Sequence, residues 1–345
     1  MGPIIGMTIG DVSGVGPEVC VKALQKQEIW EISRPLMIGD AKAIERIAKV
    51  LGVAAPVRAV ASVADARFDH GILEVLQATD VDLTTIPWGQ VNAEAGKASV
   101  QFIEKAIALA KSGEIAAIAT APINKEAINQ AGCPYPGHTE MLAALTDTKD
   151  YAMMLVADKL RVLHVTTHVS MRRACDLITT ERVLKVIRLA SRAAQELGSP
   201  QPKVAVAGLN AHAGEGGLFG KEETEAITPA VEAARKEGID TYGPLPPDTV
   251  FLRASRGQFD VAVAMYHDQG HIPVKMLGFE AGVNATVGLP IIRTSVDHGT
   301  GFGRAGQGRA DESSMVEAIK LAVMMAEANK GDKTRSSLYD KQNKP

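Results

Sequence analysis

Short apolar runs alternate along the chain with longer stretches in which apolar residues recur every three or four positions. Three apolar runs in the first third of the chain are each paired with such a helical pattern: 4–9 with 16–28, 35–40 with 41–51, and 115–123 with 94–111. Strands that alternate with helices are typical of a mostly parallel sheet covered by helices. The pattern therefore predicts an α/β protein.

A second series of strands and helices begins near residue 151. The runs YAMMLVAD and LRVLHVTTHVS are so close together that they predict paired strands. A helix is expected over 181–197, with Thr180 as N-cap and Gly198 as its end. The remaining expected elements are a strand in KVAVAGLN, a helix at 221–236, a strand in VAVAMYHD, a β-rich stretch AGVNATVGLPIIRTSV and a helix at 312–328.

The two series predict two α/β lobes with a cleft between them. The first lobe takes residues 1–130 and returns with 285–330, and the second takes 131–284. The Gly132–Gly137 turn segment marks the first boundary. The polar, Lys-rich end at 331–345 predicts a mobile tail without a site.

Composition narrows the class of partner. The 345 residues carry 37 basic and 40 acidic side chains, a net charge of -3, and no long basic run, which argues against a general nucleic-acid-binding face. Three scattered cysteines exclude a disulfide framework and fit a reducing compartment. No apolar run approaches the roughly 18 residues of a membrane span. We therefore expect a cytoplasmic protein that binds small molecules or other subunits.

Three histidines follow directly on predicted strands, where α/β sheets place their ligands. They are His168, His212 and His267. Each alone is most simply a surface or hinge histidine, but three in the same topological position favour a site. Neutral imidazole is the commonest ligand of Zn²⁺ and similar ions, and a three-histidine set leaves coordination positions for substrate. His164 is a rival of lower rank because its neighbours are apolar.

Two acids accompany these histidines. Asp268 follows His267 directly, so it is a candidate base, ligand or orienting partner of that ring. Asp248, in PPDTVF, is a second candidate, although an N-cap of the following helix explains it equally well.

Anion-binding side chains cluster after the last strands. Lys275, Asn284 and Arg293 lie on the β-rich stretch that follows HDQG. Earlier in the chain, Lys125 ends PINK, and His138 and Thr139 follow a PYPG turn. Fixed cations mixed with neutral donors suit a phosphate or carboxylate group.

Two glycine-rich loops complete the candidates. Gly10–Glu18 joins a strand to a helix, and 297–308 reads DHGTGFGRAGQG. Glycine lets a backbone approach a flat or phosphorylated ligand, although a mobile lid is the plainer explanation of the second loop. Neither loop has the GxGxxG spacing, and no Walker A, HExxH, kinase or serine-elbow motif is present.

Eight strings in order across residues 8–302 closely resemble the 4-hydroxythreonine-4-phosphate dehydrogenase family. They are TIGDVSGVGPE, PINK, PGHTE, TTHVSMR, AGLNAHAGE, PDTVF, YHDQG and GVNATVGLPIIRTSVDHGTGF. The resemblance implies an isocitrate/isopropylmalate dehydrogenase-like fold without a Rossmann domain. It also implies a homodimer that oxidises a 4-phosphorylated four-carbon hydroxy acid at carbon 3 with NAD, NADP being open, and then releases carbon dioxide.

The resemblance also assigns roles to residues. His168, His212 and His267 are expected to bind a divalent Zn, Mg or Co ion at the subunit boundary, with His168 reaching the partner's site. The substrate contacts are expected to be His138, Thr139, Lys275, Asn284 and Arg293. The cofactor contacts are expected to be Asp11, Gly14, His298, Gly299, Thr300, Ala305 and Gly306. The general base stays open among Asp248, Asp268 and Lys275. These roles place the cofactor loop in the first lobe, and the metal ligands and dimer contacts in the second.

Three departures from the family pattern favour one branch. Val12, Ser170 and Ala211 stand where the vitamin B6 enzymes carry proline. They indicate the branch that acts on 4-phospho-D-threonate or 4-phospho-D-erythronate, with a hydroxyl at carbon 2. The rivals are a phosphotransacetylase-like transferase on the same fold, an aromatic dihydrodiol dehydrogenase of the same family, and an inactive ligand-binding protein.

Overall fold

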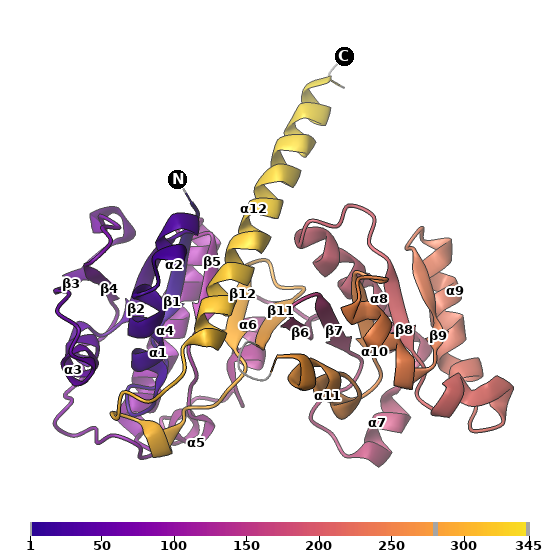
Figure 1. Cartoon of the computed structure of the whole chain (residues 1–345), viewed down its shortest axis with the longest axis horizontal. Coiled ribbons are helices and arrows are strands. Elements are labelled where there is room, and N and C mark those ends of the chain that lie inside the picture. Colours follow the sequence, from indigo (N-terminus) through magenta and orange to yellow (C-terminus); the bar gives the residue numbers. More distant parts are fainter. Residues whose placement is uncertain (1, 279–281, 343–345) are drawn as a thin grey trace. The chain divides into compact units, whose positions relative to one another are not determined.

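The computed structural model describes residues 2–278 and 282–342. The chain forms two compact units, and the α/β class predicted from the sequence is confirmed (Figure 1). Unit 1 comprises Met1–Lys149 with Leu289–Glu327, and unit 2 comprises Asp150–Gly288 with Ala328–Pro345. The Gly132–Gly137 segment lies inside unit 1. No helix in the described ranges is long and apolar enough to cross a membrane.

Unit 1 is a parallel sheet in the order β3-β4-β2-β1-β5-β12. Its strands are β1 Ile4–Thr8, β2 Arg34–Gly39, β3 Val57–Val60, β4 Leu73–Gln77, β5 Ala117–Thr120 and β12 Arg293–Val296. Its helices are α1 Gly16–Leu24, α2 Gln27–Ile32, α3 Ala41–Leu51, α4 Ala93–Ser112, α5 Lys125–Gln130, α6 His138–Leu145 and the start of α12 Ser313–Gln342. Every residue of β5 is buried, as expected for a strand covered on both faces.

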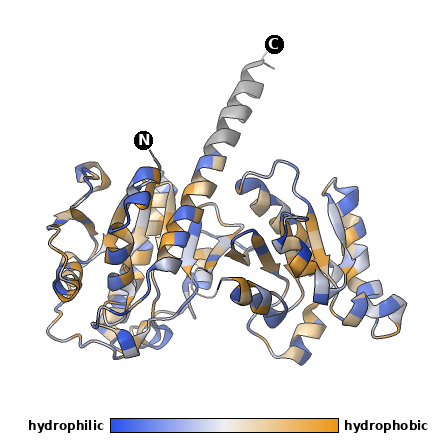
Figure 2. Ribbon diagram, in the orientation of Figure 1, coloured by the Kyte–Doolittle hydropathy of each residue, from blue (hydrophilic) through white to orange (hydrophobic). Residues whose placement is uncertain are grey.

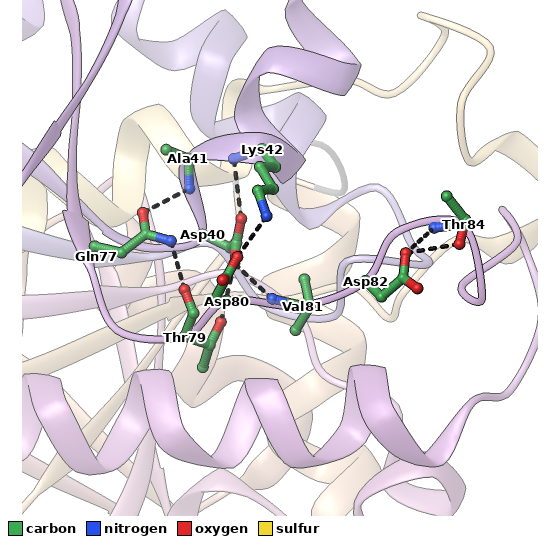
Figure 3. A network of polar contacts seen from close by, with 9 residues as sticks. All are labelled: Asp40, Ala41, Lys42, Gln77, Thr79, Asp80, Val81, Asp82 and Thr84. Carbon is green, nitrogen blue, oxygen red and sulfur yellow. Dashed lines mark hydrogen bonds and ion pairs between the residues drawn. The ribbon is translucent and has the colours of Figure 1, made fainter.

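Asp40 joins the carboxyl ends of β2 and β4 (Figure 3). This fully buried side chain caps α3 by accepting from the Lys42 amide at 2.9 Å, and it also accepts from the Val81 amide at 3.0 Å and the Thr79 hydroxyl at 3.3 Å. In a Rossmann domain the acid near this position binds the cofactor ribose. Asp40 is buried and engaged by these three groups, so its carboxylate does not face a ligand as the Rossmann acid does.

Unit 2 is a mixed sheet in the order β11-β6-β7-β10-β8-β9. Its strands are β6 Ala152–Ala157, β7 Leu160–His164, β8 Val204–Ala207, β9 Thr241–Leu245, β10 Val261–Ala264 and β11 Val283–Val287. Its helices are α7 Met171–Leu177, α8 Thr180–Glu196, α9 Thr228–Lys236, α10 Pro247–Ser255 and α11 His267–Leu277. The predicted pairing of the first two strands is confirmed, because β6 and β7 form an antiparallel pair. The strands of both units are largely apolar, whereas the helices carry both kinds of residue (Figure 2).

Several predicted boundaries were wrong for local reasons. The helix expected over 16–28 is two helices, because residues 25–28 are all exposed and offer no apolar face to continue α1. Thr179, not Thr180, caps α8 by accepting from the Arg182 amide at 3.2 Å. The helix expected over 221–236 begins with a π-helical turn, Glu223–Ile227. The predicted mobile tail continues α12 as far as Gln342, and residues 343–345 lie outside the described chain.

Candidate active site

Unit 2 brings two of the three predicted histidine ligands together. The ring centroids of His168 and His267 are 5.6 Å apart. The segments that carry them leave neighbouring parallel strands, β7 and β10, and stay hydrogen-bonded beyond the strand ends. The Val165 amide donates to the Ala264 carbonyl at 2.8 Å, and the Thr166 hydroxyl donates to the Met265 carbonyl at 2.9 Å. The expectation that strand ends gather these side chains is met for this pair.

Asp268 and His271 fix the orientation of the His267 ring. The Asp268 carboxylate lies 2.7 Å from His267 Nδ1, which leaves Nε2 for another partner. The His271 ring stacks on that of His267, with centroids 3.6 Å apart and planes 12° apart. A carboxylate on the far nitrogen is the usual arrangement behind a metal-bound histidine. Of the three roles open for Asp268, the geometry favours the orienting partner.

His164 lies behind this pair. It is 1% exposed, its ring centroid is 4.7 Å from that of His271, and burial lowers its pKa to about 3. Burial, together with the charge of His267, lowers the pKa of His271 to about 4. Both rings are therefore neutral at neutral pH. His271 was not singled out from the sequence, where only its distance of four residues from His267 could have indicated it.

Gln269 links the histidine pair to the next strand end. Its amide oxygen accepts from the Met265 backbone at 2.6 Å, and its amide nitrogen donates to the Gly208 carbonyl at 2.8 Å. Gly208 follows β8 directly and begins the segment that leads to His212. The HDQG string therefore supplies the candidate ligand, its orienting carboxylate and a tie to β8.

His212 sits on an unusual left-handed turn. His212, Ala213 and Glu215 have φ of +53°, +53° and +43°, values that non-glycine residues rarely adopt and that cost of order 1–3 kcal/mol each. The His212 side chain is exposed, and the aromatic ring recorded beside it is that of Phe219, with centroids 6.2 Å apart. Strain of this kind commonly accompanies functional sites.

The two neighbouring imidazoles are side chains of a type that binds divalent ions, but the described part of one chain does not bring a third ligand beside them. Among the side chains that the structure describes, those of residues 2–278 and 282–329, no three His, Cys, Asp or Glu side chains are close enough together to hold a metal ion. His168 and His267 provide two exposed or half-exposed imidazoles side by side. The expectation of a three-histidine metal site shared between subunits therefore stays a prediction.

A buried carboxylate holds the turn that carries His212. Glu223 is 3% exposed and its Oε1 accepts from the Leu209 and Asn210 amides, both at 2.7 Å. Its Oε2 accepts from the Asn210 side-chain amide at 2.9 Å. Sequence reasoning missed this residue, whose partners lie 13 and 14 positions away.

Glu223→Gln is therefore expected to destabilise the protein by about 1–3 kcal/mol, because the new NH₂ group faces the Asn210 amide instead of accepting from it. Urea unfolding measures the difference, and hydrogen exchange at 209–214 should accelerate. Glu222→Gln is the matched control, since Glu222 accepts from the same side-chain amide but is only half-buried, so water can satisfy its new NH₂ group, and it accepts from neither backbone amide of the turn. Equal effects of the two variants would contradict the role assigned to Glu223.

Unit 1 contains one part of the predicted anion group, Arg293, His138, Thr139 and Lys125. Arg293 is 3% exposed, and its Nε and Nη2 donate to the Thr120 hydroxyl at 3.2 and 2.8 Å. Burial lowers its pKa to about 9, against the opposing charge of Glu140. The His138 ring, at the start of α6, has a buried Nε2 without a hydrogen bond in the described structure. Burial first, and then Arg293 and Lys125, lower the pKa of His138, so it is neutral. An anion bound here would accept from His138 Nε2 and lie in the field of the Arg293 charge.

Thr139 follows His138 in the first turn of α6 and is half-buried. Lys275 and Asn284 belong to unit 2. Asn284 lies on β11 with a buried, unbonded Oδ1, but the prediction of a strand at Lys275 was wrong. Lys275 lies in the last turn of α11. The segment HIPVKML is therefore helical, with Pro273 inside the helix.

Asp248 does not cap a helix. The N-cap of α10 is Pro246, so the N-cap explanation was wrong, and Asp248 lies exposed in the first turn. A carboxylate there stabilises the helix through its dipole. Its role as a base stays a prediction.

The two glycine-rich loops touch each other in unit 1. The Val15 amide donates to the Thr300 carbonyl at 2.9 Å, and a Cβ on Gly14 would lie 2.7 Å from the same oxygen. Further along, Glu18 accepts from the Ala310 amide at 2.7 Å, and Lys22 donates to the Gly308 carbonyl at 3.0 Å. These bonds fix the second loop at both ends, which argues against a freely mobile lid.

The second loop also leaves room for a ligand. Nothing lies within 4 Å of where a Cβ would stand on Gly299 or Gly303, so these backbone segments face open space. His298 is exposed with Nδ1 2.9 Å from the Gly299 carbonyl, whereas Ala305 is buried. A ligand can therefore reach the backbone of the loop at these two positions.

Asp11 should make the stability of the protein depend on pH. Its carboxyl is fully buried, and burial raises its pKa from 3.8 to about 6, although Oδ1 accepts from the Ser13 amide at 2.8 Å. Between these values the folded chain holds a proton that the unfolded chain has lost. The free energy of unfolding therefore falls as the pH rises, by about 3 kcal/mol in all for a difference of about two pH units.

Asp11→Asn should remove that contribution. Urea unfolding at acidic and neutral pH is expected to show a shallower loss of stability in the variant than in the wild type. Identical pH profiles would show that Asp11 is ionised in the folded protein.

Comparison with known proteins decides the family. The family model described as "Pyridoxal phosphate biosynthetic protein PdxA" matches residues 31–322. The chain belongs to this family. It is 50% identical over 327 residues to the D-threonate 4-phosphate dehydrogenase of Cupriavidus necator, covering 94% of this chain and 97% of that protein. The family predicted from the sequence is thereby confirmed.

Two further members support the same conclusion. The D-threonate 4-phosphate dehydrogenase of Salmonella typhimurium is 49% identical over 93% of this chain and 98% of its own length. The crystal structure of a 4-hydroxythreonine-4-phosphate dehydrogenase from Burkholderia phymatum matches with a TM-score of 0.85 and 49% identity, covering 94% of this chain and 98% of that one. The fold is therefore that of the family.

Solved structures of proteins with the rival functions are less similar to this chain. A terephthalate 1,2-cis-dihydrodiol dehydrogenase from Burkholderia xenovorans is 31% identical, with a TM-score of 0.67, over 94% of this chain and 98% of that one. The EutD phosphotransacetylase from Staphylococcus aureus is 13% identical with a TM-score of 0.53, over 95% of this chain and 94% of that one, a likeness of fold alone.

Proposed function

We propose that this protein is an NAD-dependent, divalent-metal-dependent dehydrogenase that oxidises and decarboxylates 4-phospho-D-threonate or 4-phospho-D-erythronate. The proposal is carried by sequence identity: over nearly its full length, the chain is about 50% identical to enzymes named D-threonate 4-phosphate dehydrogenase. The branch indicated by Val12, Ser170 and Ala211 is the same one.

The overall chemistry balances in two steps. The carbon 3 hydrogen leaves as hydride to NAD⁺ while the hydroxyl proton passes to a base, giving a 3-oxo acid. Loss of carbon dioxide from carbon 1 then leaves an enolate, which takes up a proton at carbon 2 to give a three-carbon keto phosphate. A divalent ion, when bound, would supply Lewis acidity for both the oxidation and the decarboxylation.

His168, His212 and His267 are the residues proposed to hold that ion. Asp268 holds His267 with Nε2 outward, and Glu223 fixes the turn of His212. Because no single chain completes a set of three ligands among the described residues, we propose that a homodimer completes the site. Three exposed apolar side chains of α11 support a subunit contact beside His267: Ile272 at 57%, Met276 at 82% and Leu277 at 56% exposure.

The phosphorylated substrate is proposed to bind at His138, Thr139, Lys275, Asn284 and Arg293. The buried guanidinium of Arg293 and the unbonded Nε2 of His138 support an anion in unit 1. In unit 2, the buried Oδ1 of Asn284 has no hydrogen bond in the described structure, which supports its accepting a hydrogen bond from a substrate group such as a hydroxyl.

Lys275 is the proposed proton acceptor. It lines a hollow of about 380 Å³ together with His267, Asp268, His271, Ile272 and Met276. Asp268 is engaged by His267, and Asp248 lies in the exposed first turn of α10. Lys275 lines the hollow, and its nitrogen can take up the hydroxyl proton once bound substrate and cofactor desolvate it to the neutral amine.

NAD is proposed to bind at the glycine loops through Asp11, Gly14, His298, Gly299, Thr300, Ala305 and Gly306. The open space beside Gly299 supports this assignment, and so does the contact between the two loops. With Asp40 buried and saturated, the ribose must be recognised by other residues than in a Rossmann domain.

The test is spectrophotometric. Purified protein with Zn²⁺, Mg²⁺ or Co²⁺ should reduce NAD⁺ when given a 4-phosphorylated sugar acid, and should fail to do so after metal is stripped. Phosphate-dependent acyl transfer from acetyl-CoA, without nicotinamide reduction, would favour the transferase. Reduction with a cis-dihydrodiol but with no phosphorylated acid would favour the second rival.

A further inference from the structure

A segment outside both glycine loops touches each of them in unit 1. Trp88 and Gly89 follow the buried Ile86 in the irregular stretch between β4 and α4. The Gly89 amide donates to the Ser13 carbonyl at 2.8 Å in the first loop. Gly89 has a φ of +70°, and a Cβ there would lie 2.6 Å from the Phe302 carbonyl in the second loop. The segment is thus wedged between the loops.

Trp88 presses on the second loop through its ring. A Cβ built on Gly306, whose φ is +70°, would stand 2.8 Å from Cγ, Cδ1 and Cδ2 of the indole. The α-carbon of Gly306 therefore rests on the plane of the ring. Only glycine fits this contact, because any side chain would enter the space that the indole fills.

Arg46 holds the ring in place. Its guanidinium carbon lies 3.8 Å from the centre of the Trp88 ring, a cation–π contact. Its Nη1 also donates to the Ile86 carbonyl at 2.8 Å. Arg46, on α3, thus holds both the backbone at Ile86 and the ring of Trp88.

We infer that Trp88, held by Arg46, is a positioning residue for the dinucleotide, which sets the backbone of the second loop at Gly306. The inference rests on the proposed function, in which this loop binds NAD. The rigid indole ring restricts the position of the loop backbone at Gly306 more closely than a flexible aliphatic side chain can. The arrangement therefore spares part of the ordering cost that the loop would otherwise incur on binding.

A double-mutant cycle tests the contact. Trp88→Leu and Gly306→Ala should each weaken NAD⁺ binding about tenfold, measured by calorimetry on the full chain without substrate. In Trp88→Leu protein, the clash with the indole is gone and only the strain of alanine at φ +70° remains, so the added Gly306→Ala substitution should cost no more than about threefold in NAD⁺ affinity. This coupling is a readout that a general loss of stability would not produce. Trp88→Phe, which keeps an aromatic plane, should retain affinity to within about threefold.

Trp30→Phe is the matched control. Trp30 is the other tryptophan of the chain, also in unit 1, and its Nε1 donates to the Leu24 carbonyl at 2.8 Å. Its replacement should leave NAD⁺ affinity unchanged within twofold. Purely additive effects of Trp88→Leu and Gly306→Ala, or wild-type NAD⁺ affinity in Trp88→Leu protein, would overturn this inference but not the proposed function. Failure of the wild type to bind NAD⁺ or NADP⁺ would overturn the proposed function together with it.

Discussion

His212→Asn is expected to lower kcat by at least about a thousandfold while leaving the fold intact. The substitution removes one of three proposed imidazole ligands of the divalent ion, and loss of that ion removes the Lewis acid for both chemical steps. Asparagine is the replacement of choice because it tolerates the left-handed conformation at φ +53° better than alanine does. Zn²⁺ affinity, measured by competition with a chromophoric chelator, should fall in parallel with turnover.

His70→Asn is the control for this experiment. His70 is an exposed histidine of unit 1, with its ring against that of Trp30. Its replacement should change neither Zn²⁺ affinity nor kcat. A His212→Asn enzyme with wild-type turnover in metal-buffered solution would remove His212 from the metal site.

Arg293→Lys is expected to raise the KM for the phosphorylated acid by about 10- to 100-fold. Lysine keeps the positive charge but loses the planar fork that grips an anion through two N–H groups. It also loses the paired donation of Nε and Nη2 to Thr120. If the anion is held equally in the ground and transition states, kcat should change far less than KM.

Thr120→Val separates binding from packing at this position. The variant removes the acceptor for the guanidinium but keeps the charge, so we expect an increase in KM smaller than that of Arg293→Lys. Thermal unfolding of both variants shows whether unit 1 stays folded. Unchanged KM and kcat in folded Arg293→Lys protein would place Arg293 outside the substrate site.

The strand ends were the most predictable part of the site. Alternating apolar runs indicated β7 and β10, and their polar successors His168 and His267 do lie together. This succeeds because parallel strands deliver their carboxyl ends to one edge, so the order of elements alone determines which loops are neighbours.

Other parts depend on contacts that local patterns do not encode. The sequence predicts Lys275 on the β-rich stretch after HDQG, yet it lies in α11, which accommodates Pro273 in its interior. The left-handed turn of His212 is set by Glu223, a residue 11 positions further along. Trp88 lies in a stretch without periodicity, so only the folded structure reveals its contact with Gly306.

The most direct test of the proposed function is nicotinamide reduction by the wild-type protein with a divalent ion and three acids offered separately. These are 4-phospho-D-threonate, 4-phospho-D-erythronate and 4-hydroxythreonine 4-phosphate, with released carbon dioxide trapped in the same reaction. The expected result is equal amounts of reduced nicotinamide and carbon dioxide, with the highest kcat/KM for one of the two sugar acids. Absence of reduced nicotinamide with all three acids would contradict it.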